Sequence, residues 1–335
     1  GSDRSIARQA ALRAGLPDTA LATTVDRACC SSLTAINMAS RALRLGEARL
    51  SVGGGVENMS LVPYFVHAAR WGNRLGDIVL KDQLVISCPY TGRARAVQAG
   101  EEAVAYGFGR EEQDRWALRS HQRCAAGQEA GFFRWETMPV ELPQRKGPPL
   151  LFDTDESPRR DTTVEALARL RPAFDANGIV TAGNSPGITD GAAALVVTSR
   201  QRAAEMGLKP MARILGYAQA AVEPQWLFIA PAHALRRLTQ RTGLQLADFD
   251  LVELNEAFAA QVLADGRDLQ AEGWDWERVN GHGGALALGH PIGWSGARVL
   301  VTLLYALQQR GLQRGLASLC LGGGEAVALA VEMEG

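Results

Sequence analysis

The chain has 335 residues, of which 47% are hydrophobic and 21% charged, and its formal net charge at pH 7 is −1. This profile is typical of a globular protein with a large core, and it excludes the basic field that attracts nucleic acid or an anionic membrane. No apolar run in the sequence approaches the roughly 20 residues that span a bilayer. The five scattered cysteines favour a reducing, cytoplasmic compartment, and the scarcity of lysine among the basic residues indicates a bacterial coding bias.

The first predicted helix begins at Cys29–Ser32, within the stretch VDRACCSSLTAI, and carries an apolar stripe from Leu33 to Leu45. GEARLSV, at 46–52, predicts a buried strand that ends in a glycine turn at 53–55. Helix, strand and glycine turn are typical of a layered α/β fold.

Two adjacent cysteines, Cys29 and Cys30, lie at the start of this helix. A disulfide between neighbours about 3.8 Å apart would be strained, and the Cys-x-x-Cys spacing of metal sites does not occur in the sequence. Free backbone N–H groups and the positive end of a helix dipole favour the thiolate form of a thiol there. We therefore expect one reactive thiol, against the alternative of two small buried residues.

Residues 63–178 break this pattern and are rich in Arg, Trp, Pro and acidic clusters, which indicates an inserted, loop-rich region. It contains one clear helix, REEQDRWALRSHQRCAAGQEAG, with Glu111 and Glu112 in its first turn and Gly131 near its end. The stretch at 143–163, PQRKGPPLLFDTDESPRRDTT, is predicted to form an extended excursion of the chain at the protein surface. TAGNSPGITDGAAALVVTSR then predicts a turn followed by a buried strand.

The stretch GNSPG, at 183–187, matches the G-x-S-x-G turn of serine hydrolases. In that turn, the residue after the serine donates its backbone N–H to an oxyanion. Here this residue is Pro186, which has no N–H, and a strand rather than a helix follows. The sequence therefore excludes a serine hydrolase site here.

The plan of the first elements recurs near the C-terminus. HPIGWSGARVLVTLLYALQQRG predicts a helix that begins near Ser295, and LASLCL predicts a strand that ends in a glycine turn at 322–324. The repeated plan predicts two related halves that share one site.

Four motifs at the ends of predicted elements carry side chains suited to acyl chemistry. They are Cys29, Asn255-Glu256-Ala257-Phe258, Gly289-His290-Pro291 and Cys320. A histidine beside a thiol completes a Cys–His nucleophile, and glycine runs let backbone N–H groups approach an oxyanion or coenzyme A closely. Each motif alone also fits a structural role, such as a capping histidine or a plain turn.

In this order, the motifs resemble the thiolase family over essentially the whole chain. The resemblance is carried by RACCSSLTAI, GGGVENMS, REEQD..ALRSHQR, LRPAF, TAGN...DGAAAL, ELNEAFAAQVL, GGALALGHPIGWSGAR and SLCLGGG. It implies a five-layered α-β-α-β-α thiolase fold. The expected parts are an N-terminal half at 1–62 and 179–203, an inserted loop domain at 63–178 that covers coenzyme A, and a C-terminal half at 204–335.

The same resemblance assigns the acid–base roles residue by residue. Cys29 would be the nucleophile, with Cys30 as a small neighbour, and His290 would take its proton. Cys320 would act as the acid/base for the α-proton of the second acyl group.

The resemblance also implies how the charged intermediates and coenzyme A are held. Asn255, through a water, and His290 would stabilise the enolate-like thioester oxygen. The backbone N–H groups of Cys29 and Gly322 would hold the oxyanion of the acylated cysteine. The residues expected to contact the substrate or coenzyme A are Arg159, Phe174, Ala182, Ala257 and Phe258.

The implied activity is that of an acyl-CoA:acetyl-CoA C-acyltransferase, which forms or cleaves 3-oxoacyl-CoA in fatty acid metabolism and β-oxidation. Both half-reactions pass through one acyl-cysteine, which predicts ping-pong kinetics. Acyl-CoA, acetyl-CoA and free coenzyme A would be the substrates, with no metal and no redox cofactor. The family also implies a homodimer or homotetramer.

Two alternatives remain open. A condensing enzyme of the ketoacyl synthase type shares the fold but lacks a second catalytic cysteine, so Cys320 and ELNEAF favour thiolase. A catalytically inactive thiolase-like protein would bind lipid or scaffold a partner. Such proteins typically lack the nucleophile, the histidine or the second cysteine, and the sequence holds Cys29, His290 and Cys320.

The sequence departs from the family pattern in four places. Pro186 stands where a serine commonly contacts the pantetheine arm, and Glu325 stands where a neutral residue is usual. ARAVQAGEEA, at 94–103, stands where many members carry His-Met-Gly and an Ala-Glu pair, which bears on the acyl chain preference. A typical member has a further strand, helix and strand ahead of SIARQAALRAGLP, so we expect additional chain to complete the first half.

Overall fold

The computed structural model describes residues 4–67, 69–85 and 87–334. Its strands are β1 (Leu50–Asn58), β2 (Tyr64–Phe65), β3 (Lys81–Asp82), β4 (Val140–Leu142), β5 (Leu150–Phe152), β6 (Asp190–Thr198), β7 (Ala212–Ala221), β8 (Leu251–Leu254), β9 (Arg314–Leu321) and β10 (Glu325–Met333). Its α-helices are α1 (Ile6–Arg13), α2 (Ser31–Arg44), α3 (Arg95–Ala105), α4 (Arg110–Glu129), α5 (Val164–Ala168), α6 (Arg200–Glu205), α7 (Ala230–Thr242), α8 (Ala259–Asp268), α9 (Ala285–Leu288) and α10 (Ser295–Arg310).

Two sheets build the body of the molecule. The larger sheet has the strand order β7-β10-β9-β8, with β8 parallel to β9 and the other pairs antiparallel. The smaller sheet is the antiparallel pair of β1 and β6, whose register aligns Gly54 with Ala194. The chain leaves the smaller sheet after β1 and returns to it at β6, so residues 59–189 are inserted between its two strands.

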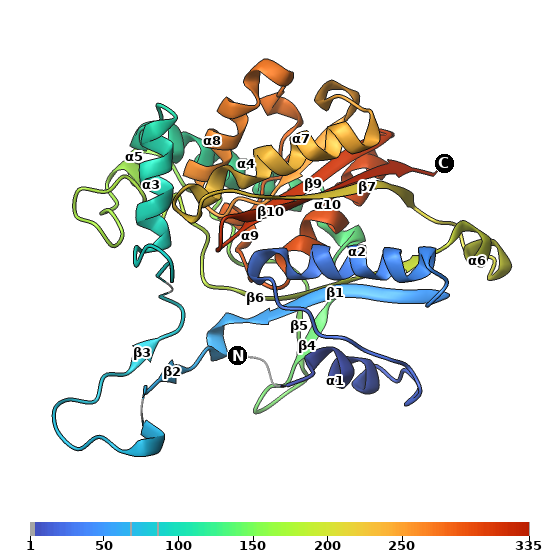
Figure 1. The fold of residues 1–335 in the computed structure, drawn as a ribbon, viewed down its shortest axis with the longest axis horizontal. Helices are drawn as coiled ribbons and strands as arrows, with labels where there is room; N and C mark the ends of the chain where they lie inside the picture. The colour runs from blue at the N-terminus through green and yellow to red at the C-terminus, as the bar shows by residue number, and fades with distance from the viewer. Residues whose placement is uncertain (1–3, 68, 86, 335) are drawn as a thin grey trace.

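Helices α2 and α10 lie between the two sheets (Figure 1). Helix α2 packs on β1 and β6, α10 packs on β8 and β9, and the two helices contact each other. Helix α7 covers the other side of the larger sheet, against β7 and β10. Strands β9 and β10 are thus covered on both faces, which explains their nearly continuous apolar sequences. The result is a succession of sheet, helix, sheet and helix layers, which corresponds to four of the five predicted layers.

Several predicted elements are confirmed at their bounds. Helix α10 begins at Ser295, and β9 ends at Leu321, directly before the predicted turn at 322–324. Helix α4 begins at Arg110, with its acidic residues in the first turn. The predicted surface excursion at 143–163 begins directly after β4 and contains β5, which pairs with β4 in an exposed hairpin. Within the described parts of the chain, no helix has both the length and the apolar character needed to cross a bilayer.

The prediction of a glycine turn at 53–55 is wrong, because these glycines lie inside β1. A Cβ atom on Gly53 would come within 2.9 Å of Cγ1 of Ile36 in α2. One on Gly55 would come within 2.0 Å of the carbonyl oxygen of Gly293, in the loop before α10. Glycine is required here so that other layers can approach the strand closely, a reason that a linear pattern does not reveal.

The prediction that β1 and β6 are buried strands is also wrong. Val52 and Val56 of β1 are 55% and 43% exposed, and Val196 of β6 is 63% exposed. Helices α2 and α10 pack on one face of this pair, so side chains that alternate to the other face remain at the surface.

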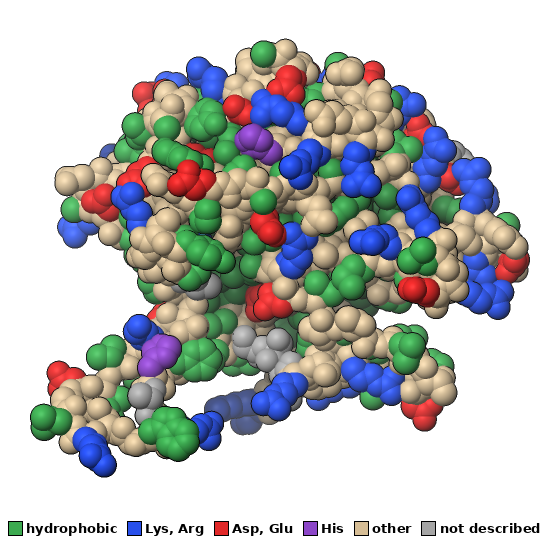
Figure 2. All heavy atoms as spheres, in the orientation of Figure 1, with side chains coloured by type: hydrophobic (Ala, Val, Ile, Leu, Met, Phe, Trp, Pro, Cys, Tyr) green, Lys and Arg blue, Asp and Glu red, His purple; other side chains and the backbone are tan. Residues whose placement is uncertain are grey.

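An arm at 64–82 projects away from the body and contains the short β2–β3 pair (Figures 1 and 2). Its apolar side chains are strongly exposed, with Trp71 at 87%, Leu75 at 93% and Val79 at 66%. Figure 2 shows hydrophobic and basic side chains side by side along it. Exposed apolar side chains gathered in this way mark an interaction surface.

We predict that Gly55→Ala destabilises the protein. Its methyl group would overlap the carbonyl oxygen of Gly293, and overpacking of this kind costs about 1–3 kcal/mol of unfolding free energy. Gly187→Ala is the matched control, because nothing lies within 4 Å of the added methyl group. Urea denaturation followed by tryptophan fluorescence should give a lower midpoint for Gly55→Ala only. Equal midpoints for the two variants would contradict the close approach of the layers at Gly55.

Candidate active site

Cys29 lies in a short 3-10 helix, η1 (Ala28–Cys30), directly before α2. Ala28 has a φ of 45°, a left-handed conformation that is costly for a residue with a side chain. Its N–H donates to Asp26 Oδ1 at 3.0 Å, and its carbonyl accepts from the Ser31 hydroxyl at 2.7 Å. These bonds hold the strained turn that orients the Cys29 side chain.

His290 lies in the loop between α9 and α10, beside this thiol. Its Nε2 is 3.2 Å from Cys29 Sγ, and its Nδ1 is 2.6 Å from Ser295 Oγ. The Ser295 hydroxyl donates its own proton to the carbonyl of Pro291 at 2.9 Å. Ser295 Oγ can therefore only accept from the ring, which places the imidazole proton on Nδ1. Nε2 is left as an acceptor aimed at the thiol, as a general base requires.

The resting pair of Cys29 and His290 is neutral. Burial raises the pKa of the Cys29 thiol to about 12, although backbone hydrogen bonding and Arg95 act to lower it. Burial, together with the charge of Arg298, lowers the pKa of His290 to about 4. Burial therefore opposes the thiolate character that the helix start favours, and the loss of solvation has the larger effect on the pKa of the thiol. Cys29 nevertheless keeps some solvent exposure, so an electrophile can reach it.

Asn255 follows β8 and is fully buried beside His290. Its Nδ2 lies 3.5 Å from His290 Nδ1, a long contact that adds little because that nitrogen already donates to Ser295. Its Oδ1 is buried and has no hydrogen-bond partner among the described residues. An unpaired buried oxygen is costly, which indicates that it serves a bound group.

Cys320 and Gly322 lie where β9 ends. Cys320 is 2% exposed, and burial raises the pKa of its thiol well above the usual range, with a further contribution from the proximity of the Cys29 thiol. Gly322 is in the turn to β10, and its carbonyl accepts from Arg95 Nη2 at 2.5 Å. Among the residues that the structure describes, no three His, Cys, Asp or Glu side chains are placed to hold a metal ion.

Glu256 lies in the predicted motif 255–258 and joins several elements by hydrogen bonds, a role that the sequence did not predict. Its carboxylate is 1% exposed and accepts four hydrogen bonds. The donors are Trp116 Nε1 at 3.0 Å, Asn280 Nδ2 at 3.0 Å, Ser120 Oγ at 2.7 Å and Leu286 N at 3.0 Å. They come from α4, α9 and the loop before α9, so Glu256 fixes the backbone that carries the neighbouring Asn255.

The residues predicted to contact the substrate or coenzyme A are spread more widely. Ala257 is buried, and Phe258 packs edge-on against Phe228 with ring centroids 5.3 Å apart. Phe174 is 66% exposed with a φ of 65°, an unusual conformation for an aromatic residue. Ala182 is exposed.

Arg159 has its backbone N–H anchored on His121 Nδ1 of α4, at 3.1 Å, and its side chain is exposed. No hydrogen bond or ion pair between described residues joins Arg159 or Phe174 to Cys29. The contacts that the structure shows at Cys29 are therefore with His290, which in turn contacts Asn255.

Glu325, which departs from the family pattern, has a partner. Arg27, two residues before Cys29, forms an ion pair with it. The same guanidinium donates to Gln219 at 2.9 Å and Thr34 at 3.2 Å. The pair ties the start of β10 to the segment before the thiol, which gives the acidic residue a structural role.

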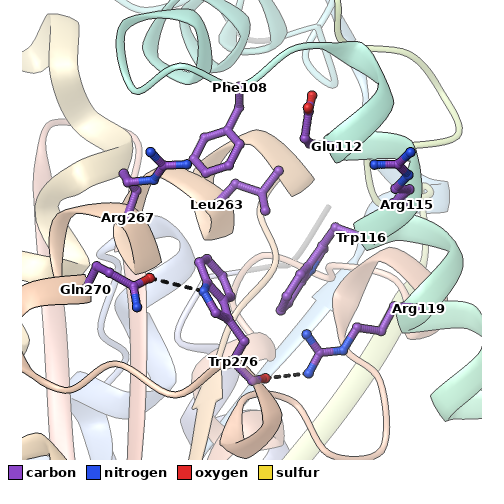
Figure 3. A pocket seen from close by; sticks show the side chains of 9 residues that line it. All are labelled: Phe108, Glu112, Arg115, Trp116, Arg119, Leu263, Arg267, Gln270 and Trp276. Carbon is purple, nitrogen blue, oxygen red and sulfur yellow. Dashed lines mark hydrogen bonds between the residues drawn. The ribbon is translucent and has the colours of Figure 1, made fainter.

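A separate groove of about 460 Å³ lies between α4 and α8 (Figure 3). Its residues are Phe108, Glu112, Arg115, Trp116, Arg119, Leu263, Arg267, Gln270 and Trp276. Trp116 and Trp276 form an edge-to-face pair, with centroids 5.5 Å apart. Arg119 covers Trp116 and donates to the carbonyl of Trp276. None of the predicted site residues lines this groove, and Trp116 connects it to Glu256.

Comparisons with known proteins match this chain to one protein family over nearly its whole length. The family models "Thiolase, N-terminal domain" and "Thiolase, C-terminal domain" match residues 1–201 and 208–333. A protein of Chromobacterium violaceum described as "Acetyl-CoA acetyltransferase" is 50% identical over 335 residues, which cover 99% of this chain and 85% of that protein. One of Pseudomonas aeruginosa with the same description is 49% identical, covering 98% and 84%. The crystal structure of the Bacillus anthracis acetyl-CoA acetyltransferase aligns with a TM-score of 0.95 at 43% identity, covering 99% and 84%.

We predict that Ser295→Ala slows the alkylation of Cys29 by iodoacetamide. Without the hydroxyl, Nδ1–H of His290 loses its acceptor, so the ring no longer holds Nε2 toward the thiol. The rate should fall about 10- to 100-fold, less than the 10²–10⁴-fold effect of removing a general base outright. Ser295→Thr, which keeps the hydroxyl, should recover most of the rate. Peptide mapping gives the rate at Cys29, and unchanged alkylation of folded Ser295→Ala would show that Ser295 does not orient the imidazole.

Proposed function

The chain belongs to the thiolase family, has the five-layered thiolase fold and is an acyltransferase, and from this premise we propose that it transfers acyl groups between coenzyme A thioesters through an acyl-cysteine on Cys29. The reaction is the reversible condensation or thiolysis of 3-oxoacyl-CoA. One observation carries the proposal: the 3.2 Å contact between Cys29 Sγ and the unprotonated Nε2 of His290.

The first half-reaction uses this neutral pair. As Sγ of Cys29 attacks the thioester carbonyl, its proton passes to Nε2 of His290. The bond between the carbonyl carbon and the coenzyme A sulfur breaks, and the departing thiolate takes the proton from the imidazolium. One thioester and one thiol are exchanged for another thioester and another thiol, so the transfer is nearly balanced in free energy. Backbone N–H groups of Cys29 and Gly322 would hold the oxyanion.

The second half-reaction assigns Cys320 as the acid/base. Its thiol first gives its proton to the neutral His290, and the resulting thiolate removes an α-proton from acetyl-CoA. The carbanion attacks the acyl carbonyl, and the thiolate released from Cys29 takes the proton back from the imidazolium. Asn255, through a water, and His290 would stabilise the enolate-like oxygen. The unpaired Oδ1 of Asn255 supports this role, because it leaves an acceptor free for that water. One acyl-enzyme shared by two half-reactions gives ping-pong kinetics.

Coenzyme A binding is assigned to Arg159 and Phe174 of the loop domain proposed at 63–178, to Ala182 of the N-terminal half, and to Ala257 and Phe258 of the C-terminal half. The exposure of Phe174 and Ala182 supports contact with a ligand. The substrates are acyl-CoA, acetyl-CoA and free coenzyme A, with no metal or redox cofactor.

The proposal also covers the enzyme's assembly and setting. The exposed apolar side chains of the arm at 64–82 support a homodimer or homotetramer. Five free cysteines support a reducing, cytoplasmic setting, in fatty acid metabolism and β-oxidation.

The test separates the two reactive cysteines by reaction step. Cys320→Ser should still accept an acetyl group from acetyl-CoA, seen as a mass increment on the intact protein. Its condensation and thiolysis turnover should fall about 10²- to 10⁴-fold, because serine is a poor base at this position. Cys29→Ser should show neither the increment nor turnover.

Cys30→Ser is the matched control, because Cys30 is a fully buried neighbour whose Sγ donates to the Leu319 carbonyl. It should retain both steps. Parental turnover in Cys320→Ser would remove Cys320 from the mechanism, and acetylation of Cys29→Ser would place the nucleophile elsewhere.

A further inference from the structure

Arg95 places a guanidinium group next to the residues assigned to the reaction. It is the first residue of α3, in the segment 94–103 that departs from the family pattern. Its Nη2 donates to the carbonyl of Gly322 at 2.5 Å, and its Nη1 donates to Gln98 at 3.0 Å. A Cβ built on Gly322 would come within 2.9 Å of the guanidinium, so the group lies directly against this turn.

No carboxylate neutralises this charge among the described residues. Arg93, two residues earlier, forms an ion pair with Glu101, but Arg95 forms none. The two hydrogen-bond acceptors described for Arg95, the Gln98 side chain and the Gly322 carbonyl, are neutral. They use only two of the five N–H donors of a guanidinium. Arg95 is half-buried at the positive end of a helix, where an unpaired cation is unfavourable. The local structure therefore favours an anion at this position.

The positive charge of Arg95 also acts on the Cys29 thiol. It opposes the burial that raises the pKa of Cys29, and Glu57 is the other charged side chain that affects this thiol. The Glu57 carboxylate is already engaged, since it accepts the N–H of Gly293 at 3.2 Å. An acyl group attached to Cys29 would thus lie within the field of a cation that no protein carboxylate pairs.

Resting on the function proposed above, we propose that this site takes acyl groups that end in a carboxylate, and that Arg95 is the residue that recognises it. The substrates would be acidic 3-oxoacyl-CoA thioesters. The planar guanidinium matches a carboxylate with two parallel N–H donors and keeps its bond to the Gly322 carbonyl. The reaction is unchanged, because the distal carboxylate takes no part in bond making and needs no further co-reactant.

A second role for Arg95 would give a different signature. If it served only to favour the Cys29 thiolate, its loss would slow all substrates alike. Recognition of a distal carboxylate instead predicts a change in preference between substrates, because only the acidic one loses an interaction. The two roles are therefore separable by comparing acidic and neutral substrates of equal chain length.

The experiment measures thiolysis of 3-oxoadipyl-CoA, which ends in a carboxylate, and of 3-oxohexanoyl-CoA, which ends in a methyl group. The parent enzyme should show a higher kcat/KM for the acidic substrate by at least about tenfold, the worth of a charge-assisted hydrogen bond. Arg95→Met should lose about 10- to 100-fold on the acidic substrate and retain or gain on the neutral one. Arg93→Met is the matched control and should keep the parental preference, because Arg93 is already paired with Glu101.

The outcomes separate this inference from the proposed function. If the parent cleaves the neutral substrate as well as or better than the acidic one, or if Arg95→Met slows both equally, the inference is overturned and the function stands. If the parent cleaves neither substrate and does not condense acetyl-CoA, the function itself fails and the inference falls with it. A circular dichroism melt should show that Arg95→Met is folded, and Arg95→Lys, which keeps the charge, should retain part of the preference for the acidic substrate.

Discussion

The hydrogen bonds that join the N-terminal ends of α2 and α10 hold the site together. The hydroxyl of Ser32 donates to the carbonyl of Trp294 at 3.2 Å and accepts from the N–H of Ala297 at 2.8 Å. Cys29 lies just before α2 and His290 just before α10, so this junction sets the distance between their side chains. The two sheets on either side of the helix pair then bury much of the contact between these side chains.

Burial between the sheets determines the protonation states of the site. It raises the pKa of the thiols of Cys29 and Cys320 and, with Arg298, lowers the pKa of His290. The resting site therefore holds a thiol and a neutral imidazole, and charge separates only when a substrate is attacked. Reactivity then depends on the orientation of the His290 ring, which Ser295 provides, and on donors that meet the charge as it develops.

The sequence predicted those parts of the molecule in which local chemistry decides the outcome. The start of α10 at Ser295 and the turn at 322–324 follow from helix and turn preferences, and both are confirmed. The prediction of a turn at 53–55 is wrong because the contacts that require these glycines come from elements distant in sequence. The raised pKa of Cys29 has a similar origin, since the desolvation of its thiol arises from the packing of whole layers. The position of Ser295 was visible, but its bond to His290 depends on the geometry of the folded loop.

The central claim is that His290 is a neutral base whose proton is on Nδ1. Nitrogen NMR of protein labelled with ¹⁵N-histidine tests it directly, with His290→Gln identifying the resonance. The account predicts a neutral Nδ1–H imidazole from about pH 5 to about pH 9 in the resting enzyme, because the pKa of His290 lies near 4. An imidazolium signal at neutral pH would show a preformed thiolate–imidazolium pair, and an Nε2–H signal would show that the ring cannot accept the thiol proton. Either result would contradict the account.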